Sequence, residues 1–470
     1  MPPADGLRGT REKIWYVAVA ALCVIAFGAM SAIAMSGFFA GKWYLADVGN
    51  IQYCLTNTWN GRFMWSPLMF GNHFAWHFTP FLLLLLPIVW LSPYPIPLVI
   101  SYQLALALTP WPIYTIARRH GLPPVVSVAA GLWFLANVFT GSLEMAMHFE
   151  VFYVLLALGT MALLPSSRRH AWWICAVAAL SVKEDAAAWL LAFGAWTAVF
   201  EKHPAVRRRG MILAAVSLGW GAVAAAIMYA VARTQTGNAT DYINRMGGLS
   251  IAGDNLWVFF LLLASSGGFC LLNWRAALLL LVPVPILLGN FPFTRHLLYY
   301  YSYPFLPFLA FATISGAATV WNWLGGERRR AWAVAAVLAL IAIVQLPMPT
   351  RTDGFRRTLF PVTSRDEMRR HVARDILPRD VPVALQFDLW GVTPWRRDVV
   401  FLKQAELKPR HYVFLDLKGV HGLDPEEYRK VMVQIRDQKN DGRRKVLFDA
   451  YDFIILSPEQ PPAAGAASSE

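Results

Sequence analysis

The chain has 470 residues, of which 57% are hydrophobic and 15% are charged, and its formal net charge is +13. A soluble domain usually has about a quarter of its residues charged, so the composition excludes an ordinary soluble protein and predicts a membrane protein. Nucleic-acid binding is not predicted, because the basic residues form short clusters between apolar segments, as they do beside membrane helices.

The first predicted element is an apolar helix over residues 14–38, which follows Arg8, Arg11 and Lys13. This segment is too long for the apolar part of a signal peptide, and no convincing cleavage site follows it. The sequence therefore predicts an uncleaved signal anchor with its N-terminus in the cytoplasm.

Further apolar segments continue to residue 347, with arginine clusters between several of them. These segments are 78–92, 97–117, 123–141, 150–165, 171–182, 186–200, 211–232, 256–273, 276–290, 300–321 and 331–347. The positive-inside rule assigns the arginine clusters to the cytoplasm. All clusters can lie on that side only if one of the apolar segments does not cross the membrane. Segment 78–92 is shorter than the roughly 20 residues that a spanning helix needs, so we predict a re-entrant or juxtamembrane helix there. Eleven transmembrane helices remain.

The composition becomes polar and mixed after Pro347. The stretch "TSRDEMRRHVARDI" predicts a helix capped by Thr363 or Ser364, and "DPEEYRKVMVQIRDQ" predicts another. The short stretches "VPVALQ", "DVVFL", "HYVFLDL" and "KVLFDAYDFIILS", which are rich in apolar and β-branched residues, predict strands. The predicted fold class is thus an all-α polytopic membrane bundle over 1–350 and a small α/β domain over 351–460. The domain is expected in the periplasm, and the tail 461–470 is expected to be disordered.

With this topology, the unusual ionisable residues of the apolar region gather at the outer face. The candidate site residues are Asp47, His73, His77, Glu144, His148, Glu150, Lys183, Glu184, Asp185, Arg295 and His296.

Three of these charges, Lys183-Glu184-Asp185, interrupt an apolar stretch between two arms of a predicted hairpin. At the centre of a bilayer each charge would cost about 2.5–3.5 kcal/mol. We therefore expect the charges to form a turn that faces a polar cavity. The alternative is a turn whose charges are merely solvated.

Asp47 follows the first span. The stretch directly after it, "VGNIQYCLTNTWNG", predicts an amphipathic helix lying in the membrane interface. The simpler role of Asp47 is an N-cap or an acid in the first helical turn. His73 and His77 are four residues apart and can share a helical face, but without a third ligand such a pair favours structural or substrate contacts over a metal.

Glu144 and His148 show the same four-residue spacing, and Glu150 lies beside them. Arg295 and His296 precede a cluster of tyrosines. The guanidinium group of an arginine binds a phosphate well, because its N–H donors match the phosphate oxygens. The alternative for Arg295 is an arginine that reaches along apolar surface to the membrane interface.

A resemblance rests on several motifs taken in order: "ADVGNIQYCLTNTWNG", "HFAWHFTPFLLLLLPIVWL", "YQLALALTPWPIYTIARRHG", "MHFE", "SVKEDAA" and "YYYSYPFLPFLAFA". Together they resemble a bacterial family of predicted membrane proteins, domain of unknown function 2079, over roughly residues 44–315. That family resembles the membrane glycosyltransferases of the C superfamily, which carry a catalytic Asp in the first outer loop and use polyprenyl-phosphate sugar donors. Many members have an acidic pair there, whereas Asp47 stands between Ala46 and Val48. No cofactor is therefore implied with certainty, and a divalent metal is left open.

The resemblance implies an inner-membrane enzyme that transfers a sugar to a glycan, lipid or protein acceptor at the periplasmic face. Asp47 would be the general base, and Lys183, Arg295 and His148 would hold the donor phosphate. Glu150, Glu184 and Asp185 would orient Lys183 or bind sugar hydroxyls. The alternatives are a transporter or flippase for a lipid-linked or anionic substrate, and a binding protein without catalysis.

Overall fold

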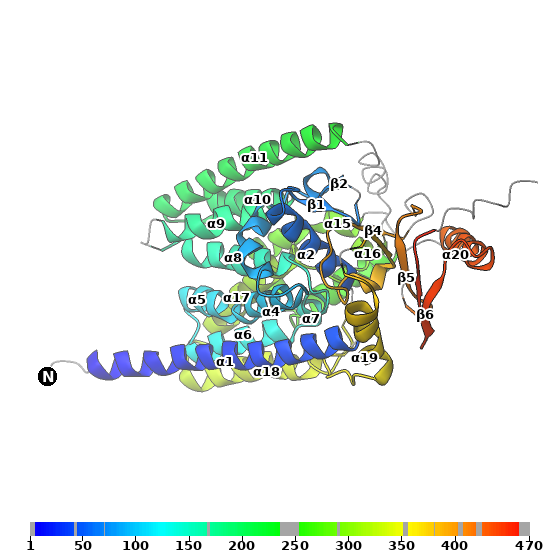
Figure 1. The fold of residues 1–470 in the computed structure, drawn as a ribbon. Coiled ribbons are helices and arrows are strands. Elements are labelled where there is room, and N and C mark those ends of the chain that lie inside the picture. Colours follow the sequence, from blue (N-terminus) through cyan, green and yellow to red (C-terminus); the bar gives the residue numbers. More distant parts are fainter. Residues whose placement is uncertain are drawn as a thin grey trace, which may run out of the picture. The chain divides into compact units, whose positions relative to one another are not determined.

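The computed structural model of the chain describes residues 5–41, 45–69, 71–166, 170–235, 253–288, 292–350, 356–379, 381–402, 408–419 and 425–459. The chain divides into two compact units. Figure 1 labels their helices and strands. The first unit comprises Met1–Ala34, Phe74–Leu82 and Ile100–Thr358. The second comprises Met35–His73, Leu83–Val99 and Leu359–Glu470. The predicted tail 461–470 lies outside the described residues, as do Arg168 and Arg169 of one arginine cluster.

The first unit is helical, and α1 and α4 continue from it into the second unit. Its longer helices are α1 (Asp5–Phe39), α4 (Ile96–Ala107), α5 (Pro110–Arg119), α6 (Pro124–Ala136), α7 (Val138–Met145), α8 (Glu150–Leu163), α9 (Ala171–Val182), α10 (Ala186–Phe200), α11 (Pro204–Arg233), α13 (Gly253–Ala264), α17 (Phe305–Trp323) and α18 (Arg328–Gln345). Shorter helical pieces are η3 (Phe269–Leu271), α14 (Trp274–Ala277), η4 (Leu278–Leu281), α15 (Val284–Leu287) and α16 (Pro292–Arg295).

Four helical segments of the described chain are long and apolar enough to cross a membrane: Glu12–Phe39, Ile96–Arg119, Pro204–Arg233 and Phe305–Trp323. A fifth is added if α6 and α7, which are bent by 52° at Asn137, form one broken span. The predicted count of eleven spans is therefore not confirmed.

The difference arises from helix length rather than from the position of the apolar segments. The predicted arms 171–182 and 186–200 match α9 and α10, yet helices of this length rise only about 18–23 Å, less than the roughly 30 Å hydrocarbon core. The predicted span 276–290 is broken into α14, η4 and α15, where Pro283 and Pro285 each lack a backbone N–H. The segment Pro80–Val89 is also short, as its sequence predicted.

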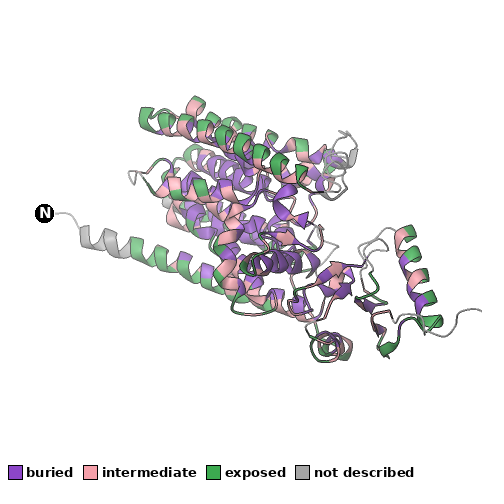
Figure 2. Cartoon of the chain, turned by 45° about the horizontal axis from the view of Figure 1, so that its top comes forward, coloured by how far each residue is buried: buried purple, intermediate pink, exposed green. Residues whose placement is uncertain are grey.

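Two long helices, α1 and α11, are largely exposed in their described parts (Figure 2), and many of their exposed side chains are apolar. In the most apolar stretch of α1 only 22% of residues are buried, and in α11 only 17%, against 78% for α17. The exposed side chains include Val24, Ile25 and Leu218. An apolar surface of this kind is typical of helices that face lipid, which agrees with the composition.

The second unit contains α2 (Leu45–Trp59), α3 (Leu86–Val89), α19 (Ser364–His371), the π-helix η5 (Val372–Ile376), η6 (Phe387–Leu389) and α20 (Pro425–Asn440). Its main sheet has the order β4-β3-β5-β7-β6. The strands are β3 (Val383–Leu385), β4 (Val399–Phe401), β5 (Tyr412–Asp416), β6 (Val446–Ala450) and β7 (Phe453–Leu456). β3 runs parallel to β4 and β5, whereas β7 runs antiparallel to β5 and β6. A short pair, β1 (Trp65–Ser66) and β2 (Gly71–Asn72), completes the described strands.

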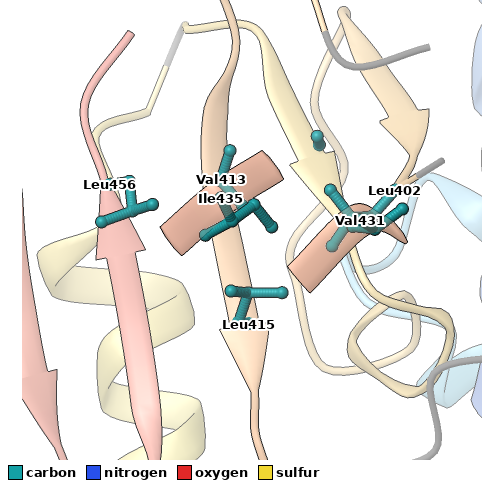
Figure 3. Close-up of a cluster of buried hydrophobic side chains, with 7 residues drawn as sticks. Leu402, Val413, Leu415, Val431, Ile435 and Leu456 are labelled. Carbon is teal, nitrogen blue, oxygen red and sulfur yellow. The ribbon is translucent and has the colours of Figure 1, made fainter. Parts of the chain in front are cut away.

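The core of this sheet forms against α20 (Figure 3). Val431 and Ile435 of α20 are four residues apart on one helical face, and they pack with Val413, Leu415 and Leu456 of the strands. The predicted strands and the helix over "DPEEYRKVMVQIRDQ" are confirmed. The last predicted strand is a hairpin, because Tyr451 and Asp452 adopt positive φ angles of 55° and 65° between β6 and β7.

Helix α2 forms where it was predicted, but it does not have the exposed polar face of an interfacial helix. Ile51 and Leu55 are buried, whereas Trp59, which lies four residues further along the same stripe, is exposed. The polar side chains Asn50, Gln52 and Asn57 are buried as well. The second unit therefore encloses much of α2, and the exposed polar face of an amphipathic helix is absent from its described residues. The location of α2 in the membrane interface stays a prediction.

The start of α19 supplies a test of the predicted cap. The Thr363 side chain accepts a hydrogen bond from the Asp366 amide, and the Asp366 carboxylate accepts one from the Thr363 amide. Losing such a cap costs about 1 kcal/mol, so in Thr363→Ala we expect amide hydrogen exchange in α19 to be roughly fivefold faster. The neighbouring Ser364→Ala is the matched control, and equal exchange in both variants would show that the cap contributes nothing.

Candidate functional site

The turn between α9 and α10 carries Lys183, Glu184 and Asp185, as predicted. Lys183 is extended, with φ −159° and ψ 153°, and its carbonyl accepts a hydrogen bond of 3.1 Å from the Ala186 amide. The Lys183 side chain is only 8% exposed and that of Glu184 only 20%. The alternative of a merely solvated turn is therefore wrong.

The Lys183 ammonium is held between a carboxylate and two aromatic rings. Its Nζ atom lies 3.1 Å from Oε1 of Glu150, whose side chain is fully buried. The same atom lies 5.3 Å from the ring centre of Tyr303 and 5.6 Å from that of Tyr300. A buried ammonium needs such partners, because an unpaired charge in an apolar interior is very costly.

Glu150 also binds His148. Oε2 of Glu150 pairs with Nδ1 of His148, and the His148 ring stacks on Tyr300 with ring centres 4.1 Å apart. One carboxylate therefore joins an ammonium and an imidazole.

The spacing that suggested a shared face for Glu144 and His148 was misleading. Helix α7 ends at Met145, Met147 has a φ of +46°, and Glu150 begins α8. His148 therefore lies in the connection between two helices, where it meets Glu150 instead of Glu144.

The two acids of the turn have partners from distant parts of the first unit. Oε1 of Glu184 lies 2.9 Å from Nδ1 of His77, and Oε2 accepts a 3.0 Å hydrogen bond from the Phe78 amide. The Tyr303 hydroxyl donates to Oδ1 of Asp185. These contacts join residues that are far apart in the sequence into one connected group.

We call this group the Lys183 cluster; it consists of His77, His148, Glu150, Lys183, Glu184, Asp185, Tyr300 and Tyr303. It contains three carboxylates, one ammonium and two imidazoles. The carboxylates can accept hydrogen bonds from hydroxyl groups, and the lysine can donate to an anion. The tyrosine rings add flat apolar surface beside these polar groups.

Glu144, another candidate of the first unit, pairs with a residue outside the Lys183 cluster. Oε2 of Glu144 lies 3.0 Å from Nε of Arg357, and both side chains are buried. Arg295 is the last residue of α16, and His296 follows it. Among the described residues, no ion pair of Arg295 is found.

Asp47 and His73 belong to the second unit. Asp47 lies in the first turn of α2 and is half-buried, so the early-turn position is confirmed. His73 is 2% exposed and begins η1, which ends at Ala75. His73 and His77 therefore do not share a helical face, and that prediction is wrong, because η1 is too short to include His77.

No group of three or more His, Cys, Asp or Glu side chains that fits a metal occurs in the part of the chain that the structure describes.

Three residues of the polar contacts were not predicted: Tyr300, Tyr303 and Arg357. The tyrosines had a signal, since they lie in the "YYYSYPF" stretch after Arg295. Arg357 had none, because nothing local distinguishes it from other arginines.

Comparison with curated proteins finds no match. A family model described as a predicted membrane protein, domain of unknown function 2079, matches residues 47–356, which is more than half of the chain. The matched region begins at Asp47 and contains the whole Lys183 cluster. The chain therefore belongs to the family of predicted membrane proteins described as domain of unknown function 2079.

Proposed function

We propose that this protein is a membrane glycosyltransferase that moves a sugar from a polyprenyl-phosphate donor to a glycan, lipid or protein acceptor. The observation that carries the proposal is the Lys183 cluster, a buried ionic group within an apolar helical unit. Ionisable residues in such surroundings are expensive, and they commonly mark a functional site. Sugar transfer needs carboxylates for hydroxyl groups and cations for a leaving phosphate, and the cluster supplies both kinds of group.

Lys183 is the proposed phosphate ligand. An ammonium has three N–H donors, and the contact with Glu150 uses one of them. Three carboxylates in the cluster outnumber the lysine, so a phosphate needs further positive charge. Protonated His148 and Arg295, which has no ion pair among the described residues, are the proposed sources.

Glu184 and Asp185 are proposed to bind sugar hydroxyls. Their partners, His77 and Tyr303, fix the orientation of the two carboxylates. Each carboxylate has capacity for more hydrogen bonds than these contacts use. The ring of Tyr300 would border the same sugar.

Asp47 is the proposed general base that accepts the proton of the acceptor hydroxyl. Its place in the first turn of α2 supports this role, because the helix dipole favours the ionised carboxylate that a base requires. The α/β domain of the second unit is proposed to recognise the acceptor.

The proposal includes an inner-membrane location, with the N-terminus in the cytoplasm and the α/β domain in the periplasm. Reporter fusions test this topology. A fusion at Gly121, just after Arg118 and Arg119, is expected to report the cytoplasm, and a fusion at Gly354 is expected to report the periplasm. A periplasmic signal at Gly121 would contradict the topology and the outer location of the proposed site.

A second candidate, a transporter or flippase for a lipid-linked substrate, is favoured by one observation. The break between α6 and α7 bends the chain by 52°, and Glu144, the next-to-last residue of α7, is buried with Arg357. Discontinuous helices of this kind form the substrate sites of many transporters. Incubation of the purified protein with a labelled donor separates the candidates, because an enzyme consumes the donor whereas a transporter or a binding protein leaves it intact.

A further inference from the structure

An apolar groove of about 320 Å³ lies in the first unit between α1, α6 and α18. Its lining includes Leu22, Ile25, Ala29, Leu132, Ala136 and Ile343. Ligand pockets span about 300–1,000 Å³, so the groove suits one hydrocarbon chain better than a complete two-chain lipid.

Two buried charged side chains, Glu144 and Arg357, also line this groove. The guanidinium of Arg357 donates to the carbonyls of Ala136 and Asn137 at 2.9 and 3.1 Å. The Ala136 carbonyl is available because α6 ends there, and the last carbonyls of a helix have no partner within it. The Asn137 carbonyl also accepts a 2.9 Å hydrogen bond from the Gly141 amide, so it is shared between α7 and Arg357. The helix break therefore holds Arg357 in place, and Arg357 in turn holds Oε2 of Glu144 at 3.0 Å.

Neither oxygen of Glu144 accepts a hydrogen bond from the described residues, and Oε1 also lacks the ion-pair contact that Oε2 makes with Arg357. Oε1 is shielded from solvent and has no hydrogen-bond partner among the residues that the structure describes. Glu144 as a whole is 1% exposed. An unsatisfied buried acceptor costs about 1–3 kcal/mol, so a ligand that donates a hydrogen bond here would recover this free energy.

The charges of Glu144 and Arg357 determine which polar head group a ligand of this groove can have. A carboxylate or phosphate would be repelled by Glu144, and an ammonium would compete with Arg357 for the same acid. A neutral hydroxyl donates to Oε1 and disturbs neither charge. The ligand would enter from the membrane, because the exposed apolar side chains Val24 and Ile25 lie on α1 beside the groove.

We propose that this groove binds the hydrocarbon chain of a membrane lipid with an uncharged hydroxyl head, and that Oε1 of Glu144 accepts the hydroxyl proton in a hydrogen bond. The site uses none of the residues of the Lys183 cluster. It therefore stands whether or not the protein transfers sugars.

The test uses a long-chain primary alcohol with a photoreactive diazirine in its chain, added to the purified full-length protein in nanodiscs. Labelled peptides are identified by mass spectrometry. We expect saturable labelling of α1, α6 and α18. The methyl ether of the same alcohol has no donor, so its apparent affinity should be about ten- to a hundredfold weaker. Equal affinity of the alcohol and the ether would overturn the role of Glu144, and stronger labelling by the matching carboxylic acid would show that Arg357 binds an anion instead.

Two variants of α1 separate the groove from ordinary lipid contact. Ala29→Phe fills the groove and should abolish saturable labelling, whereas Ala32→Phe, at an exposed position outside the lining, should leave it unchanged. Both changes add the same side chain to one helix, so a general effect on folding or insertion would affect both. Equal labelling of the two variants would show that the probe contacts only the lipid-facing surface, and the proposal would be wrong.

Discussion

Asp47→Asn is expected to lower the turnover of a polyprenyl-phosphate sugar about 10²–10⁴-fold, which is the usual contribution of a general base. The asparagine keeps the size of the side chain but is not a base at neutral pH. Asp47 lies in the first turn of α2, where the loss of its charge costs about 0.3–1 kcal/mol of helix stability. Folding and donor binding should therefore survive, and the loss should appear in kcat.

The matched control for this variant is Glu426→Gln. Glu426 is also an acid in the first turn of a helix, α20, and its side chain is 70% exposed. It has no proposed part in proton transfer, so its replacement should leave kcat unchanged, and any effect on acceptor recognition by the α/β domain should appear in KM. Near-normal turnover of a purified, folded Asp47→Asn protein would mean that Asp47 serves only the helix.

Lys183→Met is expected to lower donor affinity about ten- to a hundredfold, because a charged hydrogen bond to the phosphate contributes about 1.5–3 kcal/mol. The same change leaves the buried Glu150 without its ammonium partner. Breaking a buried ion pair from one side typically costs about 3–5 kcal/mol, so the single variant should also be less stable. Donor binding and thermal unfolding are therefore measured on the same preparations.

The double variant Lys183→Met, Glu150→Gln separates the two effects. Removing both charges should restore most of the lost stability, because the Glu150 charge is removed together with its ammonium partner. Donor affinity should stay low in the double variant if Lys183 binds phosphate. Recovery of both stability and affinity would show that Lys183 and Glu150 form a structural pair and that the phosphate is held elsewhere.

Local sequence signals predicted local structure well. The arms of the hairpin match α9 and α10, and the cap of α19 lies at Thr363, because apolar length and capping residues act within a few residues of the chain. The number of membrane spans could not be predicted from local signals in the same way. An apolar segment does not determine how long its helix is, as the proline-broken pieces between Trp274 and Leu287 show.

The candidate site was predicted as a set of residues but not as a set of contacts. The turn at Lys183 was correct, yet the partners of Glu184 and Asp185 are His77 and Tyr303, which no spacing rule connects with the turn. The spacing of Glu144 and His148 failed because it presumes a continuous helix, and Met147 interrupts it with a positive φ. Pairing across a bundle depends on how helices pack, which residue spacing alone does not contain.

The most direct test of the proposed glycosyltransferase is to incubate the purified full-length protein in proteoliposomes with polyprenyl-phosphate donors labelled in the sugar. A panel of hexose and pentose donors is combined with envelope lipid and protein extracts as acceptors, and the products are separated from the intact donor. The account predicts that the wild-type protein transfers the labelled sugar of one donor to an acceptor and releases polyprenyl phosphate. The Asp47→Asn protein should do neither. If every donor stays chemically intact, and above all if an intact donor moves to the other leaflet, the protein is a transporter or a binding protein rather than a glycosyltransferase.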